Sequence, residues 1–241
     1  KSMVTSQLAV TLHRRGYKVG VMDADITGPS IPQAFGVHDK AVGTQTALYP
    51  CVSHSGIEVM SINLLLEDET DPVIWRGPVI GGVVQQFWTD VVWDVDYLFV
   101  DMPPGTGDVP LSVFQSIALD GIIVVTSPQE LVSMVVEKAV KMAEKMDVPI
   151  VGVVENMSYY EHKGEKLRIF GEGGGARVSE QLTHSLGYEV PLLAQLPLEP
   201  ELRETGEAGR PAVLTKEGAL RSDGIGETFK NLAESLMRLP Q

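Results

Sequence analysis

The chain has 241 residues, 44% hydrophobic and 21% charged, so it can bury a sizeable core in one or two domains. Its formal net charge of −13 argues against non-specific binding to nucleic acid or to an anionic membrane, because both need a positive field. The single cysteine, Cys51, excludes an internal disulfide and a CxxC motif within these residues. This cysteine usage fits a reducing cytoplasm, and the apolar runs are too short to span a bilayer.

Strand-like and helix-like segments alternate along the chain. In chain order, apolar spacing predicts a helix over 3–15, strands over 18–23 and 57–62, a helix over 78–93, strands over 96–103 and 121–128, a helix over 130–146, a strand over 149–157, a helix over 175–187, a strand over 191–197, and helical stretches near 199–208 and 226–239. Apolar strands separated by helices indicate a mostly parallel sheet covered on both faces. We therefore predict a doubly wound α/β fold in a single domain over residues 1–241.

Sheets of this type bind ligands beyond the carboxyl ends of their strands, which draws attention to the polar residues there. Asp23 and Asp25 follow a strand in VMDADITGPSIP, where they bind a ligand or serve a solvated turn. Asp101 ends the strand of YLFVDMPPGTGD, where a carboxylate suits Mg²⁺ coordination, as in Walker B motifs, or caps a helix. Asn156 follows the strand of VVENMS, where its amide reads a nucleobase edge or serves a turn.

Lys1 and Ser2 stand directly before the first predicted helix. A P-loop reads G-x-x-x-x-G-K-[ST] before a helix, and this sequence contains only the last two positions of that motif. In a P-loop the lysine reaches the β- and γ-phosphates and the hydroxyl binds Mg²⁺. An ordinary N-cap serine explains the same dipeptide, so the pair gains meaning only from the other segments.

Together these segments resemble the Mrp/ApbC family of P-loop ATPases, which belong with the ParA/MinD-type deviant Walker A proteins and are viewed as iron–sulfur cluster carriers. The segments that match are DADITGPSIP (23–32), WRGP (75–78), DYLFVDMPPGTGD (96–108), VVTSPQE (124–130), ENMS (155–158), IFGEGGG (169–175) and LPLEPELRETGEAGRP (196–211). The similarity extends from Lys1 to about Pro211. DMPPGTGD together with WRGP is specific to this group among P-loop proteins.

The resemblance implies a role for each matching residue. Lys1 looks like the phosphate-binding lysine and Ser2 like the Mg²⁺ ligand, and the family pattern places a strand and a glycine-rich loop directly before them, outside this sequence. Asp25 matches the switch I aspartate that orients or activates the attacking water, and Asp23 lies next to it in the nucleotide site. Asp101 matches the Walker B aspartate near Mg²⁺.

The resemblance also implies the ligands and partners. Asn156 is similar to the adenine-contacting asparagine, and residues 102–108 look like switch II, which relays the state of the γ-phosphate. ATP and Mg²⁺ are the implied cofactors. An ATP-dependent homodimer follows, in which a deviant lysine, expected before Lys1, reaches the partner's phosphates. Apo forms of iron–sulfur proteins are the implied clients.

The sequence departs from the family pattern at one place. Many members carry a CxxC between ENMS and FG, whereas the predicted loop at 159–169 reads YYEHKGEKLRI and has no cysteine. A dimer of this sequence therefore cannot bridge a cluster through two CxxC pairs at that place. His162 is a candidate ligand or a solvated loop side chain, and Cys51 fits a buried structural thiol better. The iron–sulfur ligands stay unassigned.

Three further features have two interpretations each. Trp75 and Arg76 of WRGP shape a dimer face, or they serve core packing and a surface ion pair. EGGGARVSEQL is a glycine-rich start of a helix that binds an anion or makes a plain turn. The last predicted helix has an apolar stripe that docks onto its own domain or onto a membrane. The absence of a lysine-rich face favours docking onto its own domain. The stripe consists of Phe229, Leu232, Leu236 and Leu239.

The sequence thus predicts a cytoplasmic, Mg²⁺-dependent ATPase that acts as a homodimer in iron–sulfur cluster assembly or delivery, without nucleic acid or membrane as a partner. Two alternatives remain. The first is a ParA/MinD-like switch that binds a surface or partner, and the acidic charge argues against it. The second is an ATP-dependent scaffold that binds a client but carries no cluster, and the absence of a CxxC keeps it open.

Overall fold

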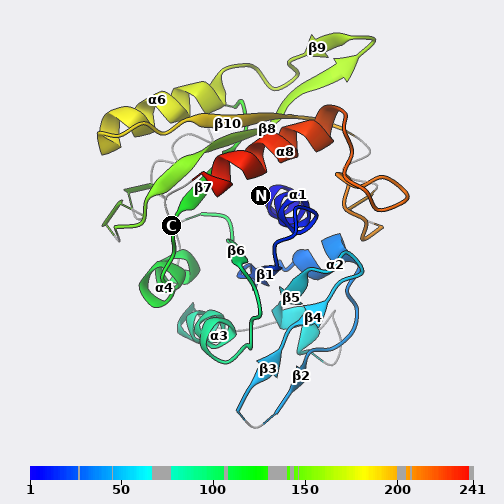
Figure 1. The fold of residues 1–241 in the computed structure, drawn as a ribbon. Helices are drawn as coiled ribbons and strands as arrows, with labels where there is room; N and C mark the ends of the chain where they lie inside the picture. Colours follow the sequence, from blue (N-terminus) through cyan, green and yellow to red (C-terminus); the bar gives the residue numbers. More distant parts are fainter. Residues whose placement is uncertain are drawn as a thin grey trace. The chain divides into compact units, whose positions relative to one another are not determined.

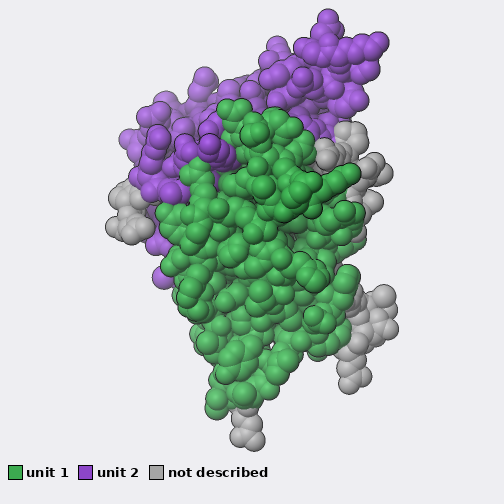
Figure 2. Space-filling model, turned by 45° about the vertical axis from the view of Figure 1, so that its right-hand side comes forward, with its two compact units in different colours: residues 1–117, 201–229 green, residues 118–200, 230–241 purple. Residues whose placement is uncertain are grey.

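The computed structural model describes residues 1–26, 28–44, 46–66, 77–105, 108–129, 140–141, 144–145, 147–199, 205–206 and 208–238. The chain divides into two compact units, which consist of residues 1–117 with 201–229 and of residues 118–200 with 230–241 (Figure 2). Each unit contains both strands and helices (Figure 1). The single domain over 1–241 stays a prediction.

The first unit contains a four-stranded sheet with the order β4–β5–β1–β6. Its strands are β1 (Val19–Asp23), β4 (Cys51–Val52), β5 (Glu58–Met60) and β6 (Tyr97–Asp101). A separate antiparallel pair is formed by β2 (Val42–Gly43) and β3 (Leu48–Tyr49). The helices are α1 (Ser2–His13), α2 (Ile31–Phe35), the 3-10 turn η1 (Ile62–Leu64), α3 (Gly77–Thr89) and α4 (Asp108–Ser116).

Strand β1 lies inside this sheet and pairs in parallel with both β5 and β6. All five of its residues are buried, which is the pattern of a parallel strand covered on both faces. Helix α1 packs against β1 and β6, and its buried residues include Val4, Leu8 and Leu12. The register pairs Asp23 with Asp101, so two carboxylates end neighbouring strands at the same edge.

The second unit contains a parallel sheet with the order β10–β8–β7. Its strands are β7 (Ile122–Thr126), β8 (Ile150–His162) and β10 (Leu192–Pro197), and the short β9 (Glu165–Leu167) pairs antiparallel with β8. Helix α6 (Gly174–Leu186) packs against β8 and β10. Helix α8 (Gly224–Met237) belongs to both units, which divide after Phe229.

The predicted mostly parallel α/β architecture is confirmed, with some elements ending elsewhere than expected. The helix predicted over 78–93 ends at Thr89, because the chain turns there into the approach to β6. The helix predicted over 130–146 lies almost wholly outside the described residues. Trp75 and Arg76, and most of the stretch 199–208, lie outside them as well.

The prediction of a loop at 159–169 is wrong, because β8 and β9 form a hairpin there. Tyr160 lies opposite Leu167, and His162 lies opposite Glu165. The turn consists of Lys163 and Gly164, both with positive φ, as a tight two-residue hairpin turn of type I′ requires. The hairpin extends away from the rest of the second unit (Figure 1). His162 is an exposed side chain that stacks on Tyr160, with ring centroids 6.3 Å apart.

The apolar stripe of α8 is turned into the protein. Phe229 and Leu232 are fully buried and Leu236 is half-buried, whereas Leu239 lies outside the described residues. This burial supports docking of the helix onto its own chain. Within the part of the chain that the structure describes, no helix combines the length and the apolar character needed to cross a membrane.

Candidate functional site

The carboxylate of Asp101 is the centre of a polar cluster at the carboxyl edge of the first sheet. Its side chain is almost fully buried. The hydroxyl of Ser2 donates a hydrogen bond of 2.5 Å to Oδ2, and the hydroxyl of Thr5 donates one of 2.9 Å to Oδ1. Ser2 and Thr5 reach the same carboxylate because residues three apart on a helix share a face. The start of α1 is thereby tied to the end of β6.

Asp23 ends β1 beside this cluster and is fully buried. Its Oδ2 accepts hydrogen bonds of 3.1 Å from the backbone N–H groups of Ser30 and Ile31 and one of 3.3 Å from the Ser61 hydroxyl. Its Oδ1 accepts the backbone N–H of Asp25 at 3.1 Å. The carboxylate therefore holds both ends of the loop between β1 and α2.

Burial raises the pKa of Asp23 to about 7. The negative charge of Asp101 acts in the same direction, whereas the backbone hydrogen bonds from Ile31, Asp25 and Ser30 oppose the shift. A positive charge placed near Asp23 would favour its ionised form and so oppose the rise of its pKa.

Asp25 lies inside the loop that Asp23 holds. Its side chain is half-buried, and its Oδ1 accepts the backbone N–H of Gly28 at 3.2 Å. The backbone N–H of Ala24 donates to the carbonyl oxygen of Asp101 at 2.9 Å, which fixes the start of the loop to the end of β6. The structure thus brings the predicted residues Ser2, Asp23, Asp25 and Asp101 to one edge of one sheet. Lys1 lies next to them as the N-cap of α1.

Asn156 belongs to the second unit and lies within β8, so the prediction that it follows the strand is wrong. The strand continues because the hairpin with β9 extends its pairing. The side-chain Oδ1 of Asn156 accepts the backbone N–H of Met157 at 2.9 Å. Met157 has a φ of 56°, an uncommon backbone conformation for a residue with a side chain.

Glu155, next to Asn156, is a buried carboxylate that the sequence reasoning missed. It accepts hydrogen bonds from the Ser158 hydroxyl, the Gly175 backbone N–H and, at 2.8 Å, the Gln195 amide. Burial acts to raise the pKa of Glu155, but these donors and the charge of Arg168 outweigh it and lower the pKa. The signal in the sequence is a charged residue inside the apolar run VGVVENM.

The glycine-rich start of α6 allows the helix to approach the strands closely. A Cβ atom at Gly175 would lie 2.7 Å from the Cβ of Glu155, and one at Gly174 would lie 2.6 Å from the carbonyl oxygen of Pro128. No larger residue fits at these two positions without a shift of backbone or strand. Close packing therefore accounts for Gly174 and Gly175, whereas Gly173 is the N-cap of α6 and has a φ of 75°.

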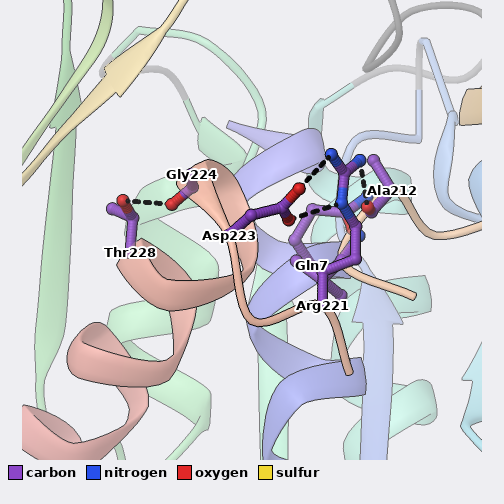
Figure 3. A network of polar contacts seen from close by, with 7 residues as sticks. Gln7, Ala212, Arg221, Asp223, Gly224 and Thr228 are labelled. Carbon is purple, nitrogen blue, oxygen red and sulfur yellow. Dashed lines mark hydrogen bonds and ion pairs between the residues drawn. The ribbon is translucent and has the colours of Figure 1, made fainter. Parts of the chain in front are cut away.

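A second polar network holds the segment before α8 in the first unit (Figure 3). The side-chain oxygen of Gln7, on α1, accepts the backbone N–H of Val213 at 3.0 Å. Arg221 donates to the carbonyl oxygen of Ala212 at 3.3 Å and forms an ion pair of 3.0 Å with Asp223. The helix that carries Ser2 is thereby fixed from this side as well.

Cys51 lies half-buried in β4, and its thiol donates to the carbonyl oxygen of Asp39 at 3.4 Å. Burial raises the pKa of the Cys51 thiol, which makes it less reactive than an ordinary cysteine. Among the described residues, no group of three or more His, Cys, Asp or Glu side chains is placed to hold a metal ion. The described part of the chain therefore assigns no ligand set to an iron–sulfur cluster.

A magnesium ion shared with a nucleotide needs fewer protein ligands. Mg²⁺ prefers hard oxygen donors, and it keeps several waters while it binds one or two side chains and the phosphates of its substrate. The hydroxyl of Ser2 and the carboxylate of Asp101 are such donors, and they lie together at the ligand-binding edge of the sheet. The residues present fit this ion.

A mostly parallel sheet whose strand-terminal Asp101 accepts a hydrogen bond from Ser2 at the start of a helix is the arrangement of an α/β protein of the P-loop NTPase class. Residues 1–237 match the family described as ParA, NUBPL iron-transfer P-loop NTPase. The chain belongs to this family.

Individual proteins agree with the assignment. The chain is 45% identical over 232 residues to an iron-sulfur cluster carrier protein of Clostridium perfringens. The alignment covers 92% of this chain and 80% of the relative. The solved nucleotide-binding protein of Archaeoglobus fulgidus in complex with ADP shares 39% identity at a TM-score of 0.72, over 87% of this chain and 81% of that one. The cell division ATPase MinD of Pyrococcus furiosus shares the fold at a TM-score of 0.69 and 23% identity. The superposition covers 99% of this chain and 93% of the MinD chain.

Proposed function

We propose that this protein is a Mg²⁺-dependent ATPase that acts in the assembly or transfer of iron–sulfur clusters. The observation that carries the proposal is the hydrogen bond between Ser2 and Asp101 at the sheet edge, beside the loop that Asp23 holds. Two comparisons support it. The Clostridium relative is named an iron–sulfur cluster carrier protein, and the Archaeoglobus protein was solved with ADP.

Phosphoryl transfer depends mainly on positioning and on neutralising the charge of the phosphates. Lys1 supplies positive charge next to the phosphates, and Ser2 with Asp101 holds the Mg²⁺ ion. Asp25 orients the attacking water. Asp23 lies in the nucleotide site but acts through the loop, because its oxygens accept three backbone N–H groups there.

The remaining parts of the proposal concern the base and the partners. Asn156 contacts the adenine. The backbone N–H of Met157 donates a hydrogen bond to Oδ1 of Asn156 and fixes the side chain of Asn156. ATP binding brings two copies of the chain together as a homodimer, and hydrolysis releases them. The clients are apo iron–sulfur proteins, and the cytoplasm is the proposed location.

The substitution Asp25→Ala in the full-length protein tests the ATPase role. We expect ATP turnover to be lost while ATP still binds, because the water is no longer oriented whereas the phosphate and Mg²⁺ contacts remain. Phosphate release measures turnover, and fluorescence of a labelled ATP analogue measures binding.

Asp94→Ala is the matched control for this experiment. Asp94 precedes β6, is 79% exposed and pairs with Lys18 at 2.8 Å, so its removal changes the charge of the protein equally but leaves the loop intact. Turnover by Asp25→Ala at the rate of the control would show that Asp25 has no catalytic role.

One observation favours a second function. The position expected for a CxxC holds the hairpin of β8 and β9, which has no cysteine. A member of the family without these thiolates can still use ATP to bind and release a client. The second candidate is therefore an ATP-dependent scaffold or ParA/MinD-like switch that carries no cluster.

A further inference from the structure

Two hydroxyl groups hold Asp101, and only one of them, that of Ser2, has a role in the proposed function. We propose that Thr5 is a positioning residue that keeps the Asp101 carboxylate aligned on the Mg²⁺ ion of the nucleotide site. This inference rests on the proposed function, since it concerns the same site.

The contacts of Thr5 favour the carboxylate over the helix backbone. Its hydroxyl lies 2.9 Å from Oδ1 of Asp101 and 3.4 Å from the carbonyl oxygen of Lys1. The shorter distance and the charge of the carboxylate direct the proton to Asp101. Threonine in a helix divides between two χ1 rotamers, and in this structure Thr5 adopts one that brings its hydroxyl within 2.9 Å of Asp101.

The hydroxyl groups of Ser2 and Thr5 each bond a different oxygen of the Asp101 carboxylate. Ser2 bonds Oδ2, and in the proposed site its oxygen is also the Mg²⁺ ligand, so its hydroxyl serves two partners. Thr5 bonds Oδ1 of Asp101 at 2.9 Å, and its longer contact of 3.4 Å is with the carbonyl oxygen of Lys1. Asp101 is only 2% exposed, so little water can replace a donor that is removed. Residues that orient a metal-binding carboxylate in this way affect metal affinity although they do not touch the metal.

The substitution Thr5→Val removes the hydroxyl and keeps the branched shape. We expect the full-length protein with ADP bound to lose about tenfold in affinity for Mn²⁺, used as a substitute for Mg²⁺ and measured by electron paramagnetic resonance of the free ion. The Mg²⁺ concentration for half-maximal ATP turnover should rise by a similar factor. Thr5→Ser keeps the hydroxyl and should restore both values to within about twofold of the wild type.

Thr11→Val is the matched control on the same helix. Thr11 is fully buried, and its hydroxyl donates to the carbonyl oxygen of Gln7 at 2.7 Å, away from Asp101. This substitution removes an equivalent hydroxyl from α1, so it reports any general effect on the helix. We expect its Mn²⁺ affinity to equal that of the wild type.

Two results would overturn the role of Thr5. One is wild-type Mn²⁺ affinity and Mg²⁺ dependence in Thr5→Val, and the other is an equal loss in Thr5→Val, Thr5→Ser and Thr11→Val. Both require a wild-type protein that binds Mn²⁺ with ADP. A wild-type protein without this binding would overturn the proposed function itself and the role of Thr5 with it, so the two failures are distinguishable.

Discussion

At the scale of single residues, two buried carboxyl groups have opposite electrostatic properties. Asp23 and Glu155 are both fully buried, and burial acts to raise the pKa of each. The pKa of Asp23 rises to about 7, and the neighbouring charge of Asp101 contributes to the rise. The pKa of Glu155 falls because its donors include a hydroxyl, a peptide N–H and an amide, with Arg168 adding positive charge. The neighbouring groups, and not burial alone, therefore decide whether the pKa of a buried carboxyl group rises or falls.

Because the pKa of Glu155 is lowered in the folded protein, we predict that its contribution to the free energy of unfolding depends on pH. A carboxyl group whose pKa is lower in the folded state than its ordinary 4.5 stabilises the fold at higher pH, and this contribution is lost as pH falls through the folded value. We expect Glu155→Gln to cost about 2 kcal/mol of unfolding free energy at pH 7, because it removes a charged acceptor from buried donors. The difference from wild type should shrink as the pH falls below 4.5.

Urea unfolding at pH 7 and in acid measures this difference. Glu180→Gln is the control, because Glu180 is exposed on α6 and its removal changes the net charge equally. A cost of Glu155→Gln that stays constant with pH would contradict the ionised state of Glu155 in the folded protein.

At the scale of elements, the approach of α6 to β8 depends on glycine. A Cβ atom at Gly175 would meet the Cβ of Glu155 at 2.7 Å and Cδ1 of Leu192 at 3.0 Å. Both neighbours belong to or adjoin strands of the sheet, so they cannot move independently. We expect Gly175→Ala to lower the unfolding free energy by about 1–3 kcal/mol through overpacking, as measured by thermal unfolding.

Gly82→Ala provides the opposite case. Gly82 lies exposed in α3, and a Cβ atom there would have nothing within 4 Å. The same substitution should raise stability by about 0.5–1 kcal/mol, because alanine favours the helix and restricts the unfolded chain. Equal effects at the two positions would show that packing against β8 does not require Gly175.

At the scale of the whole molecule, the main question is how a chain with one cysteine takes part in cluster chemistry. Cys51 donates to the carbonyl oxygen of Asp39 and is not part of a ligand group among the described residues. We expect Cys51→Ser to leave the outcome of anaerobic reconstitution with iron and sulfide unchanged in the full-length protein, as read by ultraviolet–visible absorption. A cluster band that disappears in Cys51→Ser would contradict this, and a wild type without a band would favour the scaffold.

Much of the fold could be predicted from the sequence because its signals are local. Continuous apolar runs indicate buried parallel strands, and they placed β1, β6, β7 and β10 within a few residues of their ends. The hairpin at 159–169 was missed, because its exposed polar residues lack the apolar signal of a buried strand.

The position of the candidate site at one sheet edge could be predicted in part for the same reason. Asp23, Asp25 and Asp101 stand at or just after strand ends, and parallel strands carry their ends to one edge. Thr5 and Glu155 could not be found this way, because Thr5 lies within a helix and Glu155 lies within a strand, and neither stands at a strand end. Thr5 bonds a residue 96 positions away, and Glu155 bonds Gln195 at a separation of 40.

The sequence by itself determined the α/β fold class of this protein, since apolar periodicity is a property of short segments, and the resemblance of its motifs indicated the family. Only the tertiary structure decided what each carboxylate does. Asp101 receives two hydroxyl groups of α1, and Asp23 receives the peptide groups of the loop that carries Asp25. The physical reason is that a hydrogen bond depends on distance in space, and the packing of α1 against β1 and β6 sets that distance.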